Sequence, residues 1–207
     1  MIKEKRSMPI VSFWYEFASP YSYLSAMTLA PLAQARGVKV VWRPFLLGPI
    51  FKKKGWEDSP FNLDPVKGRY MWRDMERCCE ALGLPFVKPS NFPQNSLVAA
   101  RIAYFGQDKA WGETFSKAVF HAQFGLGEDI ANLDLLAGIL NEIGAPSEQV
   151  LRNCESNEVK TGLRAAVVEA EAQGVFGAPT FVTAEGELYW GHDRMDDAIE
   201  SAFALLV

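Results

Sequence analysis

Strand-like segments lie near the two ends of this 207-residue chain, and the long stretch between them has helical spacing. Near the N-terminus, Ile10 to Phe17 and Val38 to Phe45 are rich in β-branched and aromatic side chains, which favour strands. A helix is predicted between them, with Ser19 as its N-cap, Pro20 as its first residue and Gly37 just after its end. A strand, a helix and a strand joined by short links form a right-handed unit, so we expect these two strands to be parallel.

A second strand-forming region lies near the C-terminus. Pro179 to Thr183 is predicted to be a strand, and the turn signal Glu185-Gly186 joins it to a hairpin partner at Leu188 to Trp190. Asp193 is predicted to cap a final helix, whose apolar side chains return at helical spacing. The most economical assembly of the two terminal regions is one four-stranded sheet.

The middle of the chain is predicted to be helical. Residues 46–64 hold several Pro and Gly residues and are predicted to form a loop. Glycine punctuates the helices expected after that loop, which are Pro65–Leu82, Ser96–Phe105, Lys109–Gln123, Leu133–Ile143, Ser147–Asn153 and Glu158–Gln173. The sequence therefore predicts an α/β fold, with residues 8–50 and 174–207 in the sheet domain and residues 60–173 in a large all-helical insertion.

The charge and hydropathy patterns argue against two classes of partner. The formal net charge is -4 and no stripe of Lys and Arg recurs, so we expect no nucleic acid partner, because phosphate binding needs clustered cations. No stretch approaches the roughly 20 apolar residues of a membrane span. An apolar run near the N-terminus imitates a signal peptide, but Glu16 interrupts it. We therefore expect a soluble, cytoplasmic protein.

Cysteine and histidine form neither a disulfide nor a metal pattern. Cys78, Cys79 and Cys154 are an odd number of cysteines without regular spacing, which is not a disulfide framework and fits a reducing compartment. His121 and His192 are the two histidines, and they cannot make a metal site alone. We expect no bound metal.

Ser19 is the first candidate for chemistry, because it lies where a predicted central strand delivers the chain to a helix N-terminus. Unpaired N–H groups there carry roughly half an elementary charge and stabilise an anion. Parallel α/β sheets commonly hold their ligands at this position. The alternative is that Ser19 is an ordinary N-cap.

Two further motifs are predicted to lie at the same end of the sheet. A cis Ala178-Pro179 bond would leave the Ala178 backbone facing a cleft, whereas a trans proline would simply open an edge strand. Asp193, in Trp190-Gly191-His192-Asp193, is a carboxylate able to pair with a ligand ammonium group, and His192 either donates to that ligand or is a surface residue. Together with Ser19, these motifs match a peptide-like ligand that has a thiolate, amides and an amino-acid head.

Several motifs carry a resemblance to a known family. FASPYSYL, which contains Ser19, resembles the opening of 2-hydroxychromene-2-carboxylate isomerases and of kappa-class glutathione transferases. GVFGAPTFV and YWGHDRM resemble their cis-proline loop and glutathione-head loop, and FVKPSNFPQNSLVAAR also resembles the family. The order of elements is similar to that of DsbA-like members of the thioredoxin superfamily. The resemblance spans roughly Ile10 to Ala204 and implies a thioredoxin-like four-stranded sheet.

The resemblance also implies roles for individual residues. It implies glutathione as the cofactor, with the Ser19 hydroxyl on its sulfur and the Ala178 backbone, held by Pro179, on its peptide. The loop from Trp190 through Gly191 and His192 to Asp193 is implied to bind the rest of the tripeptide. His192 departs from the asparagine expected in the isomerases, which leaves the exact substrate open.

The implied activity is glutathione-dependent isomerisation of 2-hydroxychromene-2-carboxylate to trans-o-hydroxybenzylidenepyruvate, in the degradation of aromatic hydrocarbons. Phe45, Trp72 and Asn91 are the candidates for binding the aromatic substrate. A kappa-like glutathione transferase remains open, as does a binding module without catalysis. A disulfide oxidoreductase is disfavoured, because Ser19 and Ser22 occupy both redox positions. We expect a homodimer.

Overall fold

The computed structural model describes residues 8–204, and a four-stranded mixed sheet of order β2-β1-β3-β4 lies at its centre. β1 (Ile10–Tyr15) is parallel to β2 (Lys39–Pro44), as expected. On its other side, β1 is antiparallel to β3 (Thr180–Thr183), which forms a hairpin with β4 (Leu188–Trp190). Segments from opposite ends of the chain are therefore neighbours in one sheet, which confirms the predicted α/β fold.

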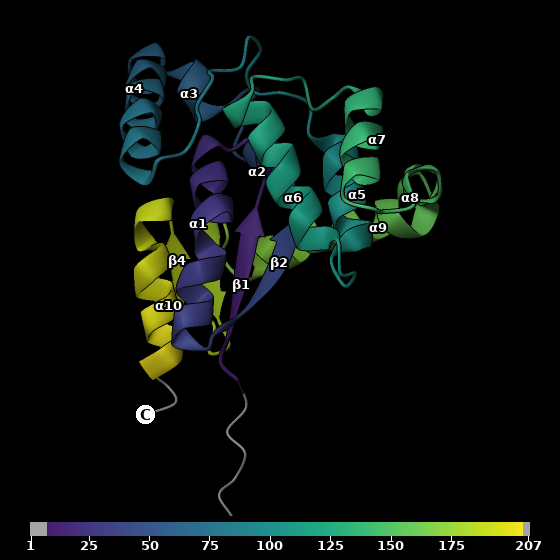
Figure 1. Ribbon diagram of the computed structural model, residues 1–207. Coiled ribbons are helices and arrows are strands. Elements are labelled where there is room, and N and C mark those ends of the chain that lie inside the picture. Colours follow the sequence, from purple (N-terminus) through teal and green to yellow (C-terminus); the bar gives the residue numbers. More distant parts are fainter. Residues whose placement is uncertain (1–7, 205–207) are drawn as a thin grey trace, which may run out of the picture.

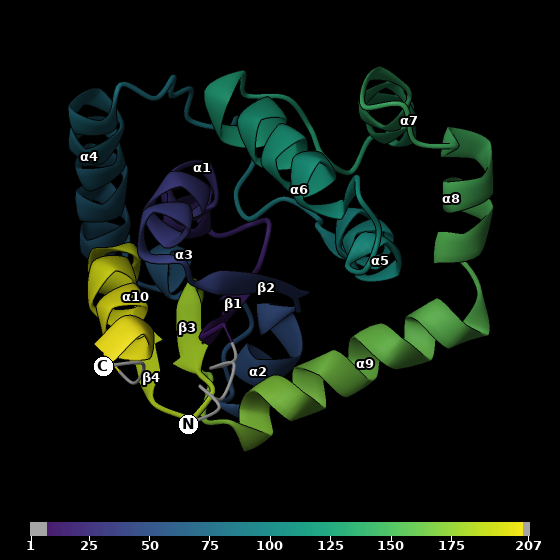
Figure 2. The ribbon, with the colours of Figure 1, turned by 60° about the horizontal axis from the view of Figure 1, so that its bottom comes forward.

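Helices cover both faces of this sheet (Figure 2). α1 (Pro20–Arg36) and α10 (Met195–Ala204) lie on one face. α2 (Leu47–Lys53) and α9 (Asn157–Ala172) lie on the other. α9, which the predicted boundary at residue 173 assigns to the helical insertion, therefore contacts the sheet directly.

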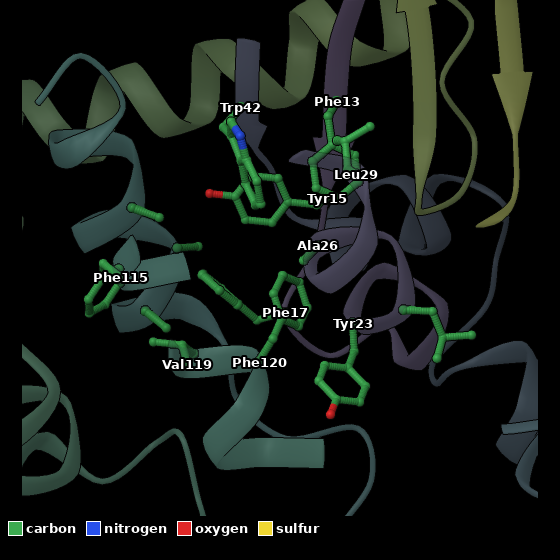
Figure 3. Packing of buried hydrophobic residues seen from close by; sticks show 14 of the residues in the cluster. Phe13, Tyr15, Phe17, Tyr23, Ala26, Leu29, Trp42, Phe115, Val119 and Phe120 are labelled. Carbon is green, nitrogen blue, oxygen red and sulfur yellow. The ribbon is translucent and has the colours of Figure 1, made fainter. Parts of the chain in front are cut away.

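The main core lies between the sheet and the helices on the α1 side. Phe13 stacks on Phe181 of β3, with ring centroids 5.2 Å apart, and meets Trp42 of β2 edge-on at 5.0 Å. Phe115 and Phe120, from the helical insertion, approach the same aromatic group (Figure 3). This shared core fixes the insertion against the end of the sheet.

The insertion itself is helical, as predicted (Figure 1). Its remaining helices are α4 (Pro65–Leu82), α5 (Leu97–Gly106), α6 (Gly112–Phe120), α7 (Leu133–Glu142) and α8 (Ser147–Cys154). The predicted helix Lys109–Gln123 is α6 followed by a π-helical turn, His121–Gly125. The other predicted boundaries are close to those observed.

Two local predictions are wrong. The predicted loop 46–64 contains α2 and a short helix, α3 (Pro60–Leu63). Gly48 and Pro49 lie in the first turn of α2, where a missing or exposed N–H costs little, and Pro60 follows the N-cap Ser59. Asp193 does not cap α10, because it lies inside a 3-10 turn, His192–Arg194, that precedes the helix.

The remaining global features concern the membrane and the thiols. Within residues 8–204, every helix is too short or too polar to cross a bilayer. Cys78, Cys79 and Cys154 are free thiols. No cluster of three metal-binding side chains occurs in the part of the chain that the structure describes.

Candidate active site

A large cleft lies beyond the end of β1, between the sheet and the helical insertion. Its volume is about 1290 Å³, which exceeds the roughly 300–1,000 Å³ of common small-molecule pockets. The walls come from the start of α1, the α2–α3 segment, α4, the loop before α5 and the two loops that flank β3 and β4. The cleft therefore has room for two ligands at once.

Ser19 lies in this cleft as the N-cap of α1. Its Oγ accepts a hydrogen bond from the Ser22 N–H at 3.3 Å and donates one to the Ala178 carbonyl oxygen at 2.8 Å. The side chain is 8% exposed, so it opens only to the cleft. Ser19 is thus a cap and a cleft residue together, and the two interpretations of the sequence are compatible.

The loop before β3 faces Ser19. The Ala178-Pro179 bond is cis, the alternative that the sequence left open. The Ala178 N–H makes no hydrogen bond to any residue within 8–204, and Pro179 accepts one from the Gly191 N–H at 2.9 Å. This contact ties the proline loop to the loop after β4, so both lie on the same wall.

The loop after β4 brings His192 and Asp193 to the cleft. Gly191 has a φ of 113°, and the Asp193 carboxylate lies where a side chain at Gly191 would begin, so glycine is required there. His192 Nδ1 lies 3.1 Å from the Ser25 hydroxyl, and burial lowers the pKa of His192 against the opposing effect of Asp193 and Asp196. A neutral imidazole is favoured at this position.

Comparison with known proteins agrees with this architecture. Residues 10–203 match the model of the DSBA-like thioredoxin domain. The chain is 30% identical to a 2-hydroxychromene-2-carboxylate isomerase of Sphingobium xenophagum, over 90% of this chain and 94% of that protein. The chain belongs to the 2-hydroxychromene-2-carboxylate isomerase family of DSBA-like thioredoxin domains.

Two other relatives of this isomerase family member are informative. A solved structure of a 2-hydroxychromene-2-carboxylate isomerase superposes with a TM-score of 0.83 at 29% identity, covering 95% of each chain. Glutathione S-transferase kappa 2 of Caenorhabditis elegans is 24% identical over 90% of this chain and 88% of its own. The named relatives are therefore enzymes of two related activities.

In this isomerase family member, acidic side chains lie at one end of the cleft. The Tyr21 hydroxyl donates to Asp74 Oδ2 at 2.9 Å, and Asp74 belongs to α4. Burial raises the pKa of the Cys78 thiol, and Asp74 and Asp193 raise it further while Arg77 lowers it. Asp74 and Asp193 thus create a negative potential on the same side of the cleft, which suits a ligand ammonium group.

Aromatic side chains line another part of the cleft. Trp190 and Phe176 have ring centroids 4.9 Å apart, and both rings are about half exposed. Lys54 places its ammonium nitrogen 5.4 Å from the Trp56 ring centroid and 5.6 Å from that of Phe176. This arrangement, which we call the aromatic wall (Lys54, Trp56, Phe176 and Trp190), offers flat apolar surface beside a cation.

The three predicted substrate-binding residues do not line the cleft. Phe45 is fully buried and packs edge-on against Trp14, 5.8 Å away, beneath the sheet. Trp72 packs against Phe92, which does line the cleft, and Asn91 is exposed outside it. The structure therefore places none of the three in the cleft, whose aromatic lining includes the aromatic wall instead; two of its four residues, Lys54 and Trp56, come from the segment predicted to be a loop.

Glu16 is a cleft residue whose role the sequence did not reveal. It follows β1, is 6% exposed, and accepts a hydrogen bond from the Ser96 hydroxyl at the start of α5. Burial raises the pKa of Glu16 to about 7, while hydrogen bonds from Ser96 and from the Ala18 backbone lower it. The signal available in the sequence was a carboxylate placed between aromatic residues of a buried strand and a helix start.

Proposed function

We propose that this protein is a glutathione-dependent isomerase that interconverts 2-hydroxychromene-2-carboxylate and trans-o-hydroxybenzylidenepyruvate. The observation that carries the proposal is the Ser19 hydroxyl at the N-terminus of α1. It is hydrogen-bonded to the Ala178 carbonyl, and both residues line a cleft with room for two ligands. The similarity to named isomerases along most of the chain supports it.

The donor set of the cleft fits glutathione. The Ala178 N–H is free of partners among the described residues and suits a peptide carbonyl, as the cis-proline loop of the resemblance implies. Asp74 and Asp193 suit the ammonium group of the tripeptide, and Lys67 and Arg194 are cleft cations that suit its carboxylates. Each charged group of glutathione therefore has an opposite charge in the cleft.

Bound glutathione supplies a thiolate, which adds reversibly to an electron-poor double bond. The single Ser19 hydroxyl proton, which donates to the Ala178 carbonyl in the structure, turns to that sulfur when glutathione binds, and the first N–H groups of α1 add a positive potential. Ser19 has no base beside it, because its Oγ contacts are Ser22 N–H and the Ala178 carbonyl, while His192 is engaged with Ser25. Ser19 therefore polarises the thiol and does not itself attack.

The aromatic wall is suited to the second substrate. A chromene carboxylate has a flat ring system and one negative charge, which match the rings of Trp56 and Phe176 and the ammonium group of Lys54. The wall and Ser19 line one continuous cleft, so a ring on the wall can present its double bond to a neighbouring sulfur.

A spectroscopic assay of the chromene tests the proposal. An isomerase reaches the chromene–pyruvate equilibrium only when glutathione is present, and the glutathione concentration stays constant. Glutathione that is consumed, with a conjugate retained, would identify instead a kappa-like transferase, the activity that the Caenorhabditis elegans relative is named for. Equal rates with and without glutathione, or no reaction at all, would contradict the proposed isomerase.

A further inference from the structure

Glu16 is a buried carboxyl in the cleft that the roles above leave unused. It lies three residues before Ser19, and the Ser19 N–H donates to its backbone carbonyl at 3.0 Å. Its carboxylate accepts a hydrogen bond from the Ser96 hydroxyl of the helical insertion, and both residues line the cleft. Ser19 contacts Ala178 and Glu16 contacts the start of α5, so the two groups have different partners within one cleft.

A purely structural role does not require a carboxyl at this position. The partners of Glu16 are neutral donors, the Ser96 hydroxyl and the Ala18 N–H, and a glutamine oxygen accepts the same bonds. Burying a carboxylate without a cation costs free energy, which a neutral amide avoids. A buried carboxyl that has only neutral donors as partners is typical of a group that changes its protonation state.

Burial alone raises the pKa of Glu16, and the hydrogen bonds from Ser96 and the Ala18 backbone lower it; no charged side chain among residues 8–204 contributes to the shift. The charged side chains that line the cleft come from the α2–α3 segment, α4 and the turn before α10, and they are Lys54, Glu57, Asp58, Lys67, Asp74, Asp193 and Arg194. With a pKa of about 7, the carboxyl of Glu16 is available in both forms near neutral pH.

We propose that Glu16 is a catalytic residue that moves a proton on the second substrate during opening of its oxygen ring. This inference rests on the proposed function. The Glu16 carboxylate accepts the proton of the substrate's 2-hydroxyl, whose oxygen forms a carbonyl double bond to C2. The bond from C2 to the ring oxygen breaks, and its electron pair leaves with that oxygen. The ring oxygen then takes the proton from Glu16 and becomes a phenol.

The proton balance of this step needs no further reagent. One carbon–oxygen single bond breaks, one carbon–oxygen double bond forms, and Glu16 ends in the ionised state in which it began. Closure of the ring follows the same path in reverse, with the phenol proton passing to Glu16 first. Opening therefore requires ionised Glu16, and its rate rises with pH through about 7.

Glu16→Gln tests the role while preserving the acceptor for Ser96. We expect the variant to melt as the wild type does, to lose the rise in rate through about pH 7, and to turn over roughly a hundredfold or more slowly. Glu57→Gln removes an exposed carboxylate from the same cleft and is the matched control, which should keep the rise. Ser96→Ala removes a bond that lowers the pKa, so the rise should move to higher pH with the plateau rate retained.

A direct titration supplies a readout that does not depend on turnover. In protein with 13C-labelled glutamate side chains, one carboxyl resonance should titrate near pH 7, disappear in Glu16→Gln and move to higher pH in Ser96→Ala. An active wild-type enzyme whose Glu16→Gln variant keeps its rate and its pH profile would overturn this inference alone. A wild-type protein that does not convert the chromene would overturn the proposed function, and the proton-transfer role with it, even where Glu16 titrates near 7.

Discussion

At the scale of single residues, the observed N-cap of Ser19 and its proposed bond to the glutathione sulfur can be measured separately in one variant. Ser19→Ala removes the donor to bound sulfur, so the pKa of bound glutathione should rise. Losing one hydrogen bond to a charged group costs about 1.5–3 kcal/mol, so the rate near neutral pH should fall roughly ten- to a hundredfold and recover in part at higher pH. Ultraviolet titration of the bound thiolate measures the pKa directly.

Ser22→Ala is the control for Ser19→Ala. The Ser22 hydroxyl is fully buried and has no hydrogen-bond partner within residues 8–204, so its removal should leave the thiolate titration unchanged. Ser19→Ala also removes the N-cap bond to the Ser22 N–H and should lower the free energy of unfolding by about 1 kcal/mol. A loss of stability with an unchanged thiol pKa would show that Ser19 is only a cap.

Asp193 provides a second test at this scale, through ligand-linked stability. A ligand bound only by the native state at about 100 times its dissociation constant adds about 2.7 kcal/mol, so glutathione should raise the melting temperature by several degrees. Asp193→Asn should reduce that shift, because it removes a partner of the ammonium group. Asp196 is an exposed neighbour outside the cleft, so Asp196→Asn should leave the glutathione-induced shift unchanged. Equal shifts in the two variants would show that Asp193 does not bind glutathione.

At the scale of elements, the proposed function predicts that the α2–α3 segment, which lines the cleft, contributes to recognition of the second substrate. Lys54→Ala should raise KM for the chromene carboxylate by up to about fivefold and leave kcat unchanged, because an exposed ion pair contributes about 0.2–1 kcal/mol. Lys52→Ala removes an exposed cation of α2 that does not line the cleft and is the matched control. The uncharged methyl ester of the substrate should show no difference between wild type and Lys54→Ala, and an equal KM increase for both compounds would contradict the assignment.

Elements also show which features the sequence could predict. Gly37 and Gly83 end long helices in the left-handed conformation, and such local signals placed the strands and most helices correctly. α2 and α3 were missed for two reasons. They are seven and four residues long, which is too short to show the repeat of apolar residues that marks a helix, and their prolines suggested a loop although proline is tolerated in the first turn of a helix.

The same distinction holds for the candidate site. Ser19, Ala178 and Asp193 line one cleft, and the sequence could predict that they lie together because each is beside the end of a predicted strand or helix. The contact of Glu16 with Ser96 and the assembly of the aromatic wall depend on how the insertion folds back over the sheet. No local sequence pattern predicts that the insertion packs against this end of the sheet.

At the scale of the whole molecule, we predict a homodimer. Leu63 and Val66, at the α3–α4 junction, are 51% and 67% exposed, and large apolar side chains of this kind often lie in subunit contacts. Sedimentation equilibrium at micromolar concentration should therefore give twice the 23.1 kDa of one chain. A mass near that of a single chain would contradict the prediction.

The strand order has a consequence for how the chain reaches this state. β1 is central, yet one of its two partner strands, β3, is among the last segments to be synthesised. Val11 of β1 can therefore pair with Thr183 of β3 only after nearly the whole chain has been made. Until then, the nascent β-α-β unit exposes an unpaired strand edge beside the aromatic face of Phe13, which favours association with other chains. Contacts so distant in sequence also slow folding. A ribosome-bound chain that stops before residue 180 should therefore bind chaperones that shield hydrophobic strands, and release from them should require the final hairpin.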